Sequence, residues 1–458
     1  MSSLFGSLSI GVRPLLAHRG PLNTIANNLS NFNTLGYSRQ LAILTQPSLR
    51  DTGRISIGNG VDFEGVQSAR NIILELLIDE EIQQQSRLKS FLSSMNLVQS
   101  LFNETEGAGL NDAINRLFNS FRELSANPTY VPARQVVIFA AQNLASGFHQ
   151  IGQQLRTIQE RVDQGVRQTV EEINSDTAQL ARLNQPVASQ QGESERSGNL
   201  EHQRYSVLNP LSKLVDVIVT DLDDGSLTVT TSYGVPLVAA AHSFAPSVAA
   251  DADTGFLHIF SRGADVTSKF TGGQLAGLLE ARDQAISLTI ADIDNLARSI
   301  IYCSNIQNRK GRDLQGEQGN NFFQPAVQHL PGAKVGAAEG FAMATTDPSR
   351  IAARADGTRG DNANALAMAD IQKQALLNGE TAAQFYSSLV SRVGKKVSSA
   401  VDEQEAVGLV LRQLQKQRAD IAGGSWDEEA ASLIRYQRAY EAAAEVVAAI
   451  NDLTSEVI

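Results

Sequence analysis

The sequence predicts a mainly α-helical protein with a β-rich insertion. Apolar residues keep a heptad spacing at both ends of the chain, and a longer apolar seam runs from about residue 133 to residue 183. A strand-like alternation of period two is concentrated between residues 215 and 270. We therefore expect terminal helices paired as a coiled coil, a central bundle of long helices and a small β domain, in a chain of 458 residues.

The first helix is predicted by an apolar seam whose positions step by three and four residues. They are Leu4, Leu8, Gly11, Leu15, His18, Leu22, Ile25 and Leu29, with Gly11 and His18 as its weak places. Pro14 and Pro21 fall in the same stretch, and an internal proline removes a backbone hydrogen bond. We therefore expect this helix either to begin after Pro21 or to bend there.

Two stretches after this helix favour turns and short strands. Residues 23–39 are rich in Asn, which favours helix ends, and Gly36 suits a positive φ angle. Residues 53–65 alternate polar and apolar residues between glycines, which predicts a short hairpin.

Further helices are predicted wherever apolar residues return at helical spacing. They cover residues 71–102, 110–125, about 133–183, 200–214, a stretch that begins at Gly272 and includes Ile300, 363–378 and 381–421. In the helix at 133–183 the apolar seam takes two successive steps of four residues after Val162, a stutter that locally unwinds a coiled coil. Residues 185–199 and 308–362 are polar and rich in Gly, Asn or Asp, so loops are expected there.

The β-rich region begins where the apolar period changes. Residues 215–219 alternate, Asp224-Gly225 is typical of a hairpin turn, and the alternation resumes at residues 227–231. Residues 256–260 predict another strand.

The last helix is predicted by a second heptad seam, which follows the break at Gly423-Gly424. Its positions are Leu433, Tyr436, Tyr440, Ala443, Val447, Ile450, Thr454 and Val457. Only Thr454 among them is polar, so one stripe of the helix is suited to a partner helix. Asp427, Glu428 and Glu429 complement the positive end of its dipole.

Composition excludes several classes of function. The chain has 38 basic and 49 acidic residues and no basic run, so nucleic-acid binding is not expected. No stretch reaches the roughly 18 apolar residues that span a bilayer, so membrane insertion is not expected. Cys303 is the only cysteine, which excludes an intrachain disulfide and a cysteine-rich zinc site.

No constellation of catalytic residues stands out. The 6 histidines show neither HExxH nor another close ligand spacing, and no GxSxG motif occurs. Asp223-Asp224 is more typical of a turn than of a catalytic dyad, and His202 is expected to be a surface residue. We therefore expect no enzymatic activity, no catalytic residue, no metal site and no cofactor.

Motifs at both ends of the chain resemble bacterial flagellar axial proteins, the family of rod, hook and hook-associated subunits. The N-terminal motif is Asn27-Asn-Leu-Ser-Asn-Phe-Asn-Thr-Leu-Gly-Tyr-Ser-Arg-Gln40. The C-terminal motifs are Gln413-Leu-Gln-Lys-Gln-Arg418, Trp426-Asp-Glu-Glu-Ala430 and Leu433-Ile-Arg-Tyr-Gln-Arg-Ala-Tyr440. The resemblance covers essentially the whole chain, and within the family it is to the subunit of the hook–filament junction.

The chain departs from the family pattern at Pro14 and Gly20-Pro21. It also departs at Glu201-His-Gln-Arg204, where the family usually has a more acidic segment. The chain is short for the family, which suggests that the outermost domain is small or absent.

The resemblance implies a structural adaptor that is secreted by type III export without a cleaved signal and self-assembles at the hook–filament junction. The terminal segments are expected to order only when packed against neighbours. The expected partners are identical subunits in a ring, hook protein, hook-associated protein 3 and a dedicated export chaperone at the C-terminal segment.

The resemblance also implies a division of the chain. A coiled-coil segment with the axial motif is expected at 1–50 and a second one at 422–458. The helical wall domain would comprise 51–200 and 271–421, with the 308–362 loop, and an outer β-rich domain would cover 201–270.

Assembly residues are expected in both end motifs. They are Leu22, Ile25, Asn27, Asn28, Leu29, Asn33, Gly36, Tyr37, Arg39, Leu433, Tyr436, Tyr440, Ala443, Val447, Ile450 and Val457. Alternatives are another axial subunit (hook-associated protein 3, flagellin, or hook or rod protein) and a cytoplasmic coiled-coil scaffold. The Asn-rich motif with Gly36-Tyr37 argues against flagellin.

Overall fold

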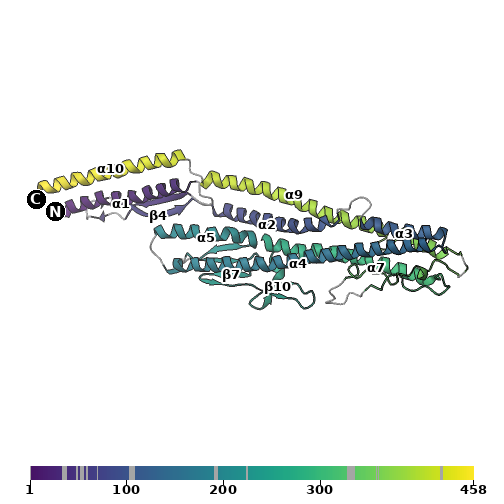
Figure 1. Cartoon of the computed structure of the whole chain (residues 1–458). Helices are drawn as coiled ribbons and strands as arrows, with labels where there is room; N and C mark the ends of the chain where they lie inside the picture. Colours follow the sequence, from purple (N-terminus) through teal and green to yellow (C-terminus); the bar gives the residue numbers. More distant parts are fainter. Residues whose placement is uncertain are drawn as a thin grey trace. The chain divides into compact units, whose positions relative to one another are not determined.

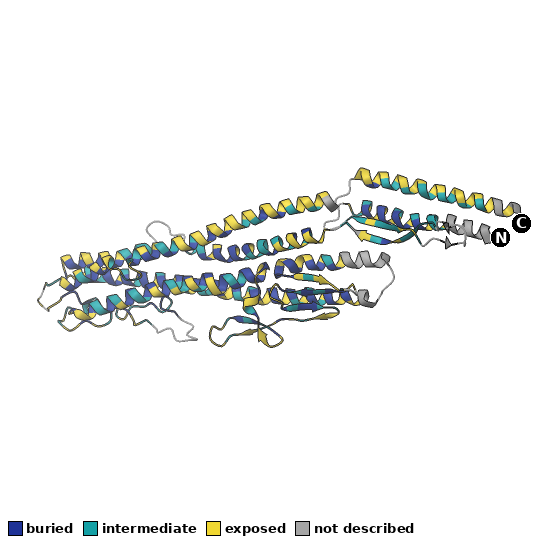
Figure 2. Ribbon diagram, turned by 180° about the vertical axis from the view of Figure 1, so that it is seen from behind, coloured by how far each residue is buried: buried dark blue, intermediate teal, exposed yellow. Residues whose placement is uncertain are grey.

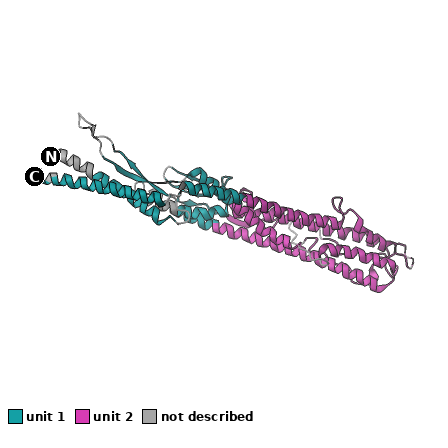
Figure 3. Cartoon of the chain, turned by 90° about the horizontal axis from the view of Figure 1, so that it is seen from above, with its two compact units in different colours: residues 1–84, 173–245, 407–458 teal, residues 85–172, 246–406 magenta. Residues whose placement is uncertain are grey.

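The fold is described from a computed structural model of the chain. Described are residues 2–32, 39–47, 50–51, 56–57, 60–69, 71–102, 109–189, 194–222, 225–326, 336–356, 358, 360–422 and 426–457. Two compact units are present (Figure 3). Unit 1 comprises Met1–Gln84, Ile173–Ala245 and Val407–Ile458, and unit 2 comprises Gln85–Glu172 and Pro246–Ala406. Neither unit is therefore one continuous stretch of sequence.

Unit 1 contains both ends of the chain. Helices α1 (Ser2–Ser30) and α10 (Trp426–Val457) lie side by side (Figure 1). A two-stranded antiparallel ribbon of β1 (Gln40–Thr45) and β4 (Asp62–Ser68) also packs on α1. The short strands β2 (Arg50–Asp51) and β3 (Ser56–Ile57) pair with each other.

The hairpin predicted within residues 53–65 is wrong in its main pairing. β4 pairs with β1, so its partner lies upstream of the predicted hairpin. The physical reason is that both strands pack on α1, which gives β1 and β4 a shared surface to cover.

The remainder of unit 1 contains a four-stranded antiparallel sheet. Its strands follow chain order: β5 (Ile218–Asp221), β6 (Leu227–Thr230), β7 (Pro236–Ala239) and β8 (His242–Ser243). Asn184 of helix α4 (Val131–Ser189) donates its side-chain amide to the carbonyls of Leu227, at 2.9 Å, and Ala240, at 2.8 Å. Arg204 of helix α5 (Ser194–Leu214) donates to the carbonyl of Gly225 at 2.9 and 3.0 Å. These bonds tie the sheet to two helices.

Unit 2 is mainly a bundle of helices. It contains α3 (Leu110–Ala126), α6 (Gly273–Glu280), the π-helix η2 (Ala281–Ile286), α7 (Ser287–Lys310) and α8 (Ala363–Asp370), with most of α2 (Ile72–Ser100), α4 and α9 (Ala382–Ala422). The 3₁₀ turns are η1 (Thr267–Lys269), η3 (Pro348–Arg350) and η4 (Ile371–Lys373). A three-stranded antiparallel sheet joins the bundle, in the order β11 (Ala264–Asp265), β10 (Leu257–Ser261) and β9 (Ser247–Ala250).

The core of unit 2 includes a cluster of aromatic rings. Phe148 of α4 stacks on Phe341 with ring centroids 4.9 Å apart, and Phe323 packs edge-on against Phe341 at 4.7 Å. All three side chains are buried. The cluster holds the irregular segment after α7 against the bundle.

Most predicted helices are confirmed, and the predicted fold class is confirmed as well. Three details differ. α4 continues to Ser189, so the loop expected from residue 185 is shorter. The helix expected at 363–378 ends at Asp370, followed by η4 and a positive φ at Asn378. The β-rich region contains two separate sheets, one in each unit.

Candidate functional site

The paired helices α1 and α10 form the candidate site, because α1 contains the start of the N-terminal motif, residues 27–30, and α10 contains the C-terminal motifs at 426–430 and 433–440. The predicted seam of α10 lies where the helix is partly covered. Leu433, Tyr436, Tyr440, Ala443, Val447 and Ile450 are half-buried, whereas most residues between them are exposed. Figure 2 shows the same division along α10. The heptad spacing therefore identified the face of α10 that turns toward α1.

α1 is covered from two sides. Its seam residues Leu22 and Leu29 are half-buried and Ile25 is 6% exposed. A second face, which the heptad pattern did not indicate, is also buried: it includes Ala17, Thr24 and Asn28. The second face is explained by the β1–β4 ribbon, which packs on α1 as α10 does.

The prolines do not delay the start of α1. The helix runs from Ser2 to Ser30 with Pro14 and Pro21 inside it, so a start after Pro21 is wrong. Gly20 permits a close approach at this point, because a Cβ added to it would lie 2.5 Å from a ring carbon of Phe63 in β4. The hydroxyl of Thr24 donates to the carbonyl of Gly20 at 3.0 Å. Packing of the ribbon on α1 offsets the hydrogen bonds that the prolines remove.

A polar network joins α1, β1 and α10 at one end of the helix pair. Asn28 of α1 and Gln40 of β1 exchange two hydrogen bonds, from Asn28 Nδ2 to the Gln40 carbonyl and from the Gln40 N–H to Asn28 Oδ1, both 2.9 Å long. Asn28 Nδ2 also lies 3.3 Å from Glu429 Oε2. Arg39 Nε donates to Glu429 Oε1 at 2.7 Å, and Arg39 Nη1 lies 3.5 Å from Glu428 Oε2. We call Asn28, Arg39 and Glu429 the clasp.

Burial makes the clasp more than a surface ion pair. The side chain of Glu429 is 4% exposed and that of Arg39 is 25% exposed. A carboxylate removed from water needs both a counter-charge and hydrogen bonds, and Glu429 receives them from Arg39 and Asn28. The clasp therefore depends on residues that lie 390 and 401 positions apart in the sequence.

Aromatic residues lie beside the clasp and along the seam. Phe32 and Trp426 pack edge-on with ring centroids 5.8 Å apart, and they remain 43% and 53% exposed. The ring centroids of His18 and Tyr436 lie 6.0 Å apart. Burial lowers the pKa of His18 below its ordinary value. Burial at this seam position therefore favours the neutral form of the His18 imidazole.

The structure brings some of the predicted assembly residues together at the clasp. Asn28 and Arg39 lie in the clasp, and Asn27 Nδ2 contacts Gln40 Oε1 at 3.3 Å. Asn33, Gly36 and Tyr37, and the side chain of Val457, lie outside the described residues. Glu429 was missed as a site residue, since the sequence indicated only its favourable place at a helix N-terminus. An assembly role for the predicted set stays a prediction.

The described residues offer little for catalysis. None of them form a group of three or more His, Cys, Asp or Glu that could hold a metal ion. Asp223 and Asp224 lie outside the described residues, as does the side chain of His202. None of the described helices combines the length and apolar character needed to cross a bilayer.

Known proteins of similar sequence agree with this architecture. Residues 95–323 match the family model of the "Flagellar hook-associated protein FlgK helical domain". The flagellar hook-associated protein 1 of Bacillus subtilis (strain 168) is 26% identical over 500 residues, covering 100% of this chain and 98% of that protein. Its counterpart in Salmonella typhimurium is 26% identical over 549 residues, covering 99% of each. The Escherichia coli K12 counterpart is 25% identical over 548 residues and covers both chains fully.

A solved structure has the same fold. The structure of the flagellar hook junction protein FlgK from Burkholderia pseudomallei aligns with a TM-score of 0.67 and 19% sequence identity. The alignment covers 76% of this chain and 100% of that one.

Proposed function

The chain belongs to the family of the flagellar hook-associated protein FlgK, and from this premise we propose that it joins hook to filament as a structural subunit of their junction. Members of this family are structural components of the flagellum, so the chain assembles with other axial components and is not an enzyme. The observation that carries the proposal is the pairing of α1 with α10, because α1 contains the start of the N-terminal motif that resembles axial proteins and α10 contains the C-terminal motifs at 426–430 and 433–440.

The helix pair suits assembly because α10 is incompletely covered. Among the α10 residues whose side chains are described, only Glu429 is buried, and the seam residues are half-buried. A long helix in water takes most of its stability from tertiary packing. Neighbouring copies in a ring would complete the burial of the seam, which supports Leu433, Tyr436, Tyr440, Ala443, Val447 and Ile450 as assembly residues.

The finer partners follow from the same proposal. A ring of identical subunits would contact hook protein on one side and hook-associated protein 3 on the other. The subunit would be secreted through the flagellar type III channel, with an export chaperone covering its C-terminal segment. An incompletely covered α10 is the kind of apolar surface that a chaperone covers before assembly.

Isolated hook–basal bodies test the location. An antibody or tag on this chain is expected to label the distal end of the hook, and label spread along the hook or filament would contradict the proposal. Deleting residues 433–458 is expected to abolish incorporation. The fold of unit 2 should be retained, since none of its residues lies in α10. A truncated subunit that still reached the hook tip would exclude the helix pair as the assembly element.

A further inference from the structure

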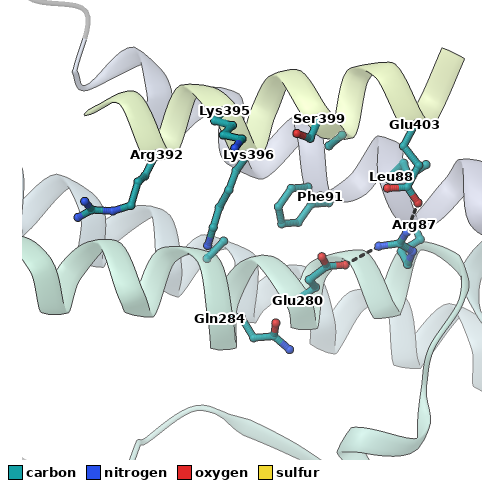
Figure 4. A pocket seen from close by; sticks show the side chains of 12 residues that line it. Arg87, Leu88, Phe91, Glu280, Gln284, Arg392, Lys395, Lys396, Ser399 and Glu403 are labelled. Atoms are coloured by element: carbon teal, nitrogen blue, oxygen red, sulfur yellow. Dashed lines mark hydrogen bonds and ion pairs between the residues drawn. The ribbon is translucent and has the colours of Figure 1, made fainter. Parts of the chain in front are cut away.

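A groove crosses unit 2 between α9 and the segment from α6 to η2 (Figure 4). Its volume is about 480 Å³, within the range of roughly 300–1,000 Å³ common for binding pockets. The floor is apolar and includes the buried side chains of Leu88, Phe91, Ala285 and Ala400. One wall is π-helical, and such segments occur frequently at functional sites.

The two ends of the groove differ in charge. At one end Arg87 donates to Glu280 at 2.7 Å and to Glu403 at 2.8 Å, so its guanidinium is neutralised (Figure 4). Toward the other end Lys395 and Lys396 of α9 are exposed, and neither forms an ion pair with any residue that the structure describes. The groove thus combines an apolar floor with two uncompensated ammonium groups. A complementary ligand is apolar and carries negative charge at one end.

The chain itself carries a surface of this chemistry on α2. In unit 1, Leu74 and Ile78 of α2 pack against Leu411 of α9. The opposite side of α2 exposes four aliphatic side chains at helical spacing. They are Ile72, Ile73, Leu76 and Leu77, which are 67%, 70%, 48% and 44% exposed.

The exposed side of α2 ends in acidic residues. Glu80 follows Leu76 by one helical turn, so it continues the same face, and Glu81 is next to it. Neither carboxylate has a cationic partner among the described residues. Burial and the charge of Glu80 raise the pKa of Glu81. We call residues 72, 73, 76, 77, 80 and 81 the acidic stripe.

We infer that the acidic stripe of one copy docks in the groove of a second copy. The aliphatic side chains cover the apolar floor, and Glu80 and Glu81 meet Lys395 and Lys396. The inference rests on the proposed function, which requires contacts between identical subunits. It deepens that function by assigning one lateral contact outside the terminal helices.

A second copy is the occupant because the chain supplies both complementary surfaces. The stripe and the groove are different surfaces, so the contact is heterologous, and such contacts generate rings or helical arrays when repeated.

Single-cysteine chains test the contact directly. In a Cys303→Ser background, purified Glu80→Cys chain is mixed with Lys396→Cys chain and oxidised mildly. We expect disulfide-linked heterodimer at about tenfold the yield given by Glu171→Cys mixed with Lys396→Cys. Glu171 is a suitable control because it is an exposed glutamate on α4, a helix that contributes no residue to the stripe. Equal yields in the two mixtures would overturn the inference.

Charge reversal provides a second readout. Lys395→Glu with Lys396→Glu, or Glu80→Lys with Glu81→Lys, is expected to lower the self-association constant about tenfold, because two ion pairs become repulsive. The chain that carries all four charge reversals is expected to regain most of the lost self-association, because the ion pairs are restored with opposite polarity. Failure of the four-fold variant to recover, or no loss in either double variant, would also overturn the inference. Labelling of the hook tip tests the proposed function separately, since it needs none of these substitutions.

Discussion

Replacing Arg39 with alanine tests whether the clasp holds α10 to α1 within one chain. The change leaves the Glu429 carboxylate, which is 4% exposed, with Asn28 as its remaining partner in the clasp. Removing one partner of a fully buried pair costs about 3–5 kcal/mol. Because Arg39 is 25% exposed, we expect a smaller loss of about 2 kcal/mol in the local stability of the helix pair.

Hydrogen exchange of the α10 backbone measures this loss. A destabilisation of about 2 kcal/mol corresponds to roughly 30-fold faster exchange of amides that open with the clasp. The affected amides should lie in the first turns of α10, around Leu433 and Tyr436. Arg438→Ala is the matched control, because Arg438 is an exposed arginine on the same helix.

A double variant separates the ion pair from general damage. Arg39→Ala combined with Glu429→Leu removes both charges, so no buried carboxylate is left unpaired, and we expect slower exchange than in Arg39→Ala alone. The reasoning is refuted if Arg39→Ala and Arg438→Ala exchange equally. Amides that are already unprotected in the unmodified free chain would instead support the expectation that the terminal segments order only against neighbours.

Three further changes probe other parts of the molecule. Gly20→Ala places a methyl group 2.5 Å from the ring of Phe63. We expect the local stability of the packing of β4 on α1 to fall by about 1–3 kcal/mol, which would be seen as faster exchange of the β4 amides. Unchanged exchange would contradict the close packing. Phe148→Ala removes a buried ring stacked on Phe341; we expect unit 2 to lose about 3–5 kcal/mol in denaturant unfolding, and a loss below about 1 kcal/mol would exclude this cluster as a core. Burial lowers the pKa of His18, so the contribution of His18 to the stability of the helix pair is present above its ordinary pKa of about 6.5. This contribution decreases as the pH falls below about 6.5 toward the lowered pKa. His18→Leu should remove the resulting pH dependence of α10 exchange, and an unchanged pH profile would assign that dependence to another group.

The helices of this fold could be predicted because their signals are local. The apolar residues from Leu433 to Ile450 are separated by alternating steps of three and four residues, a pattern that a single helix with one partner face produces. These positions are half-buried in the structure. The same spacing identified Leu22, Ile25 and Leu29 on α1.

The rest could not be predicted, since it depends on contacts between distant segments. The β1–β4 ribbon pairs Gln40 with Ser68, and the alternation within residues 53–65 favoured a nearer partner. The ion pair of Arg39 with Glu429 spans 390 positions. Charge alone could not select this glutamate from the 49 acidic residues.

The large sequence separation within the clasp has a consequence for biogenesis. Glu429 follows every element of the chain except α10 itself, so the clasp cannot form before the chain has been synthesised as far as α10. Contacts between such remote segments also form late, because a long loop must first be closed. The clasp therefore fastens α10 to α1 only after nearly the whole chain, up to Glu429, is present.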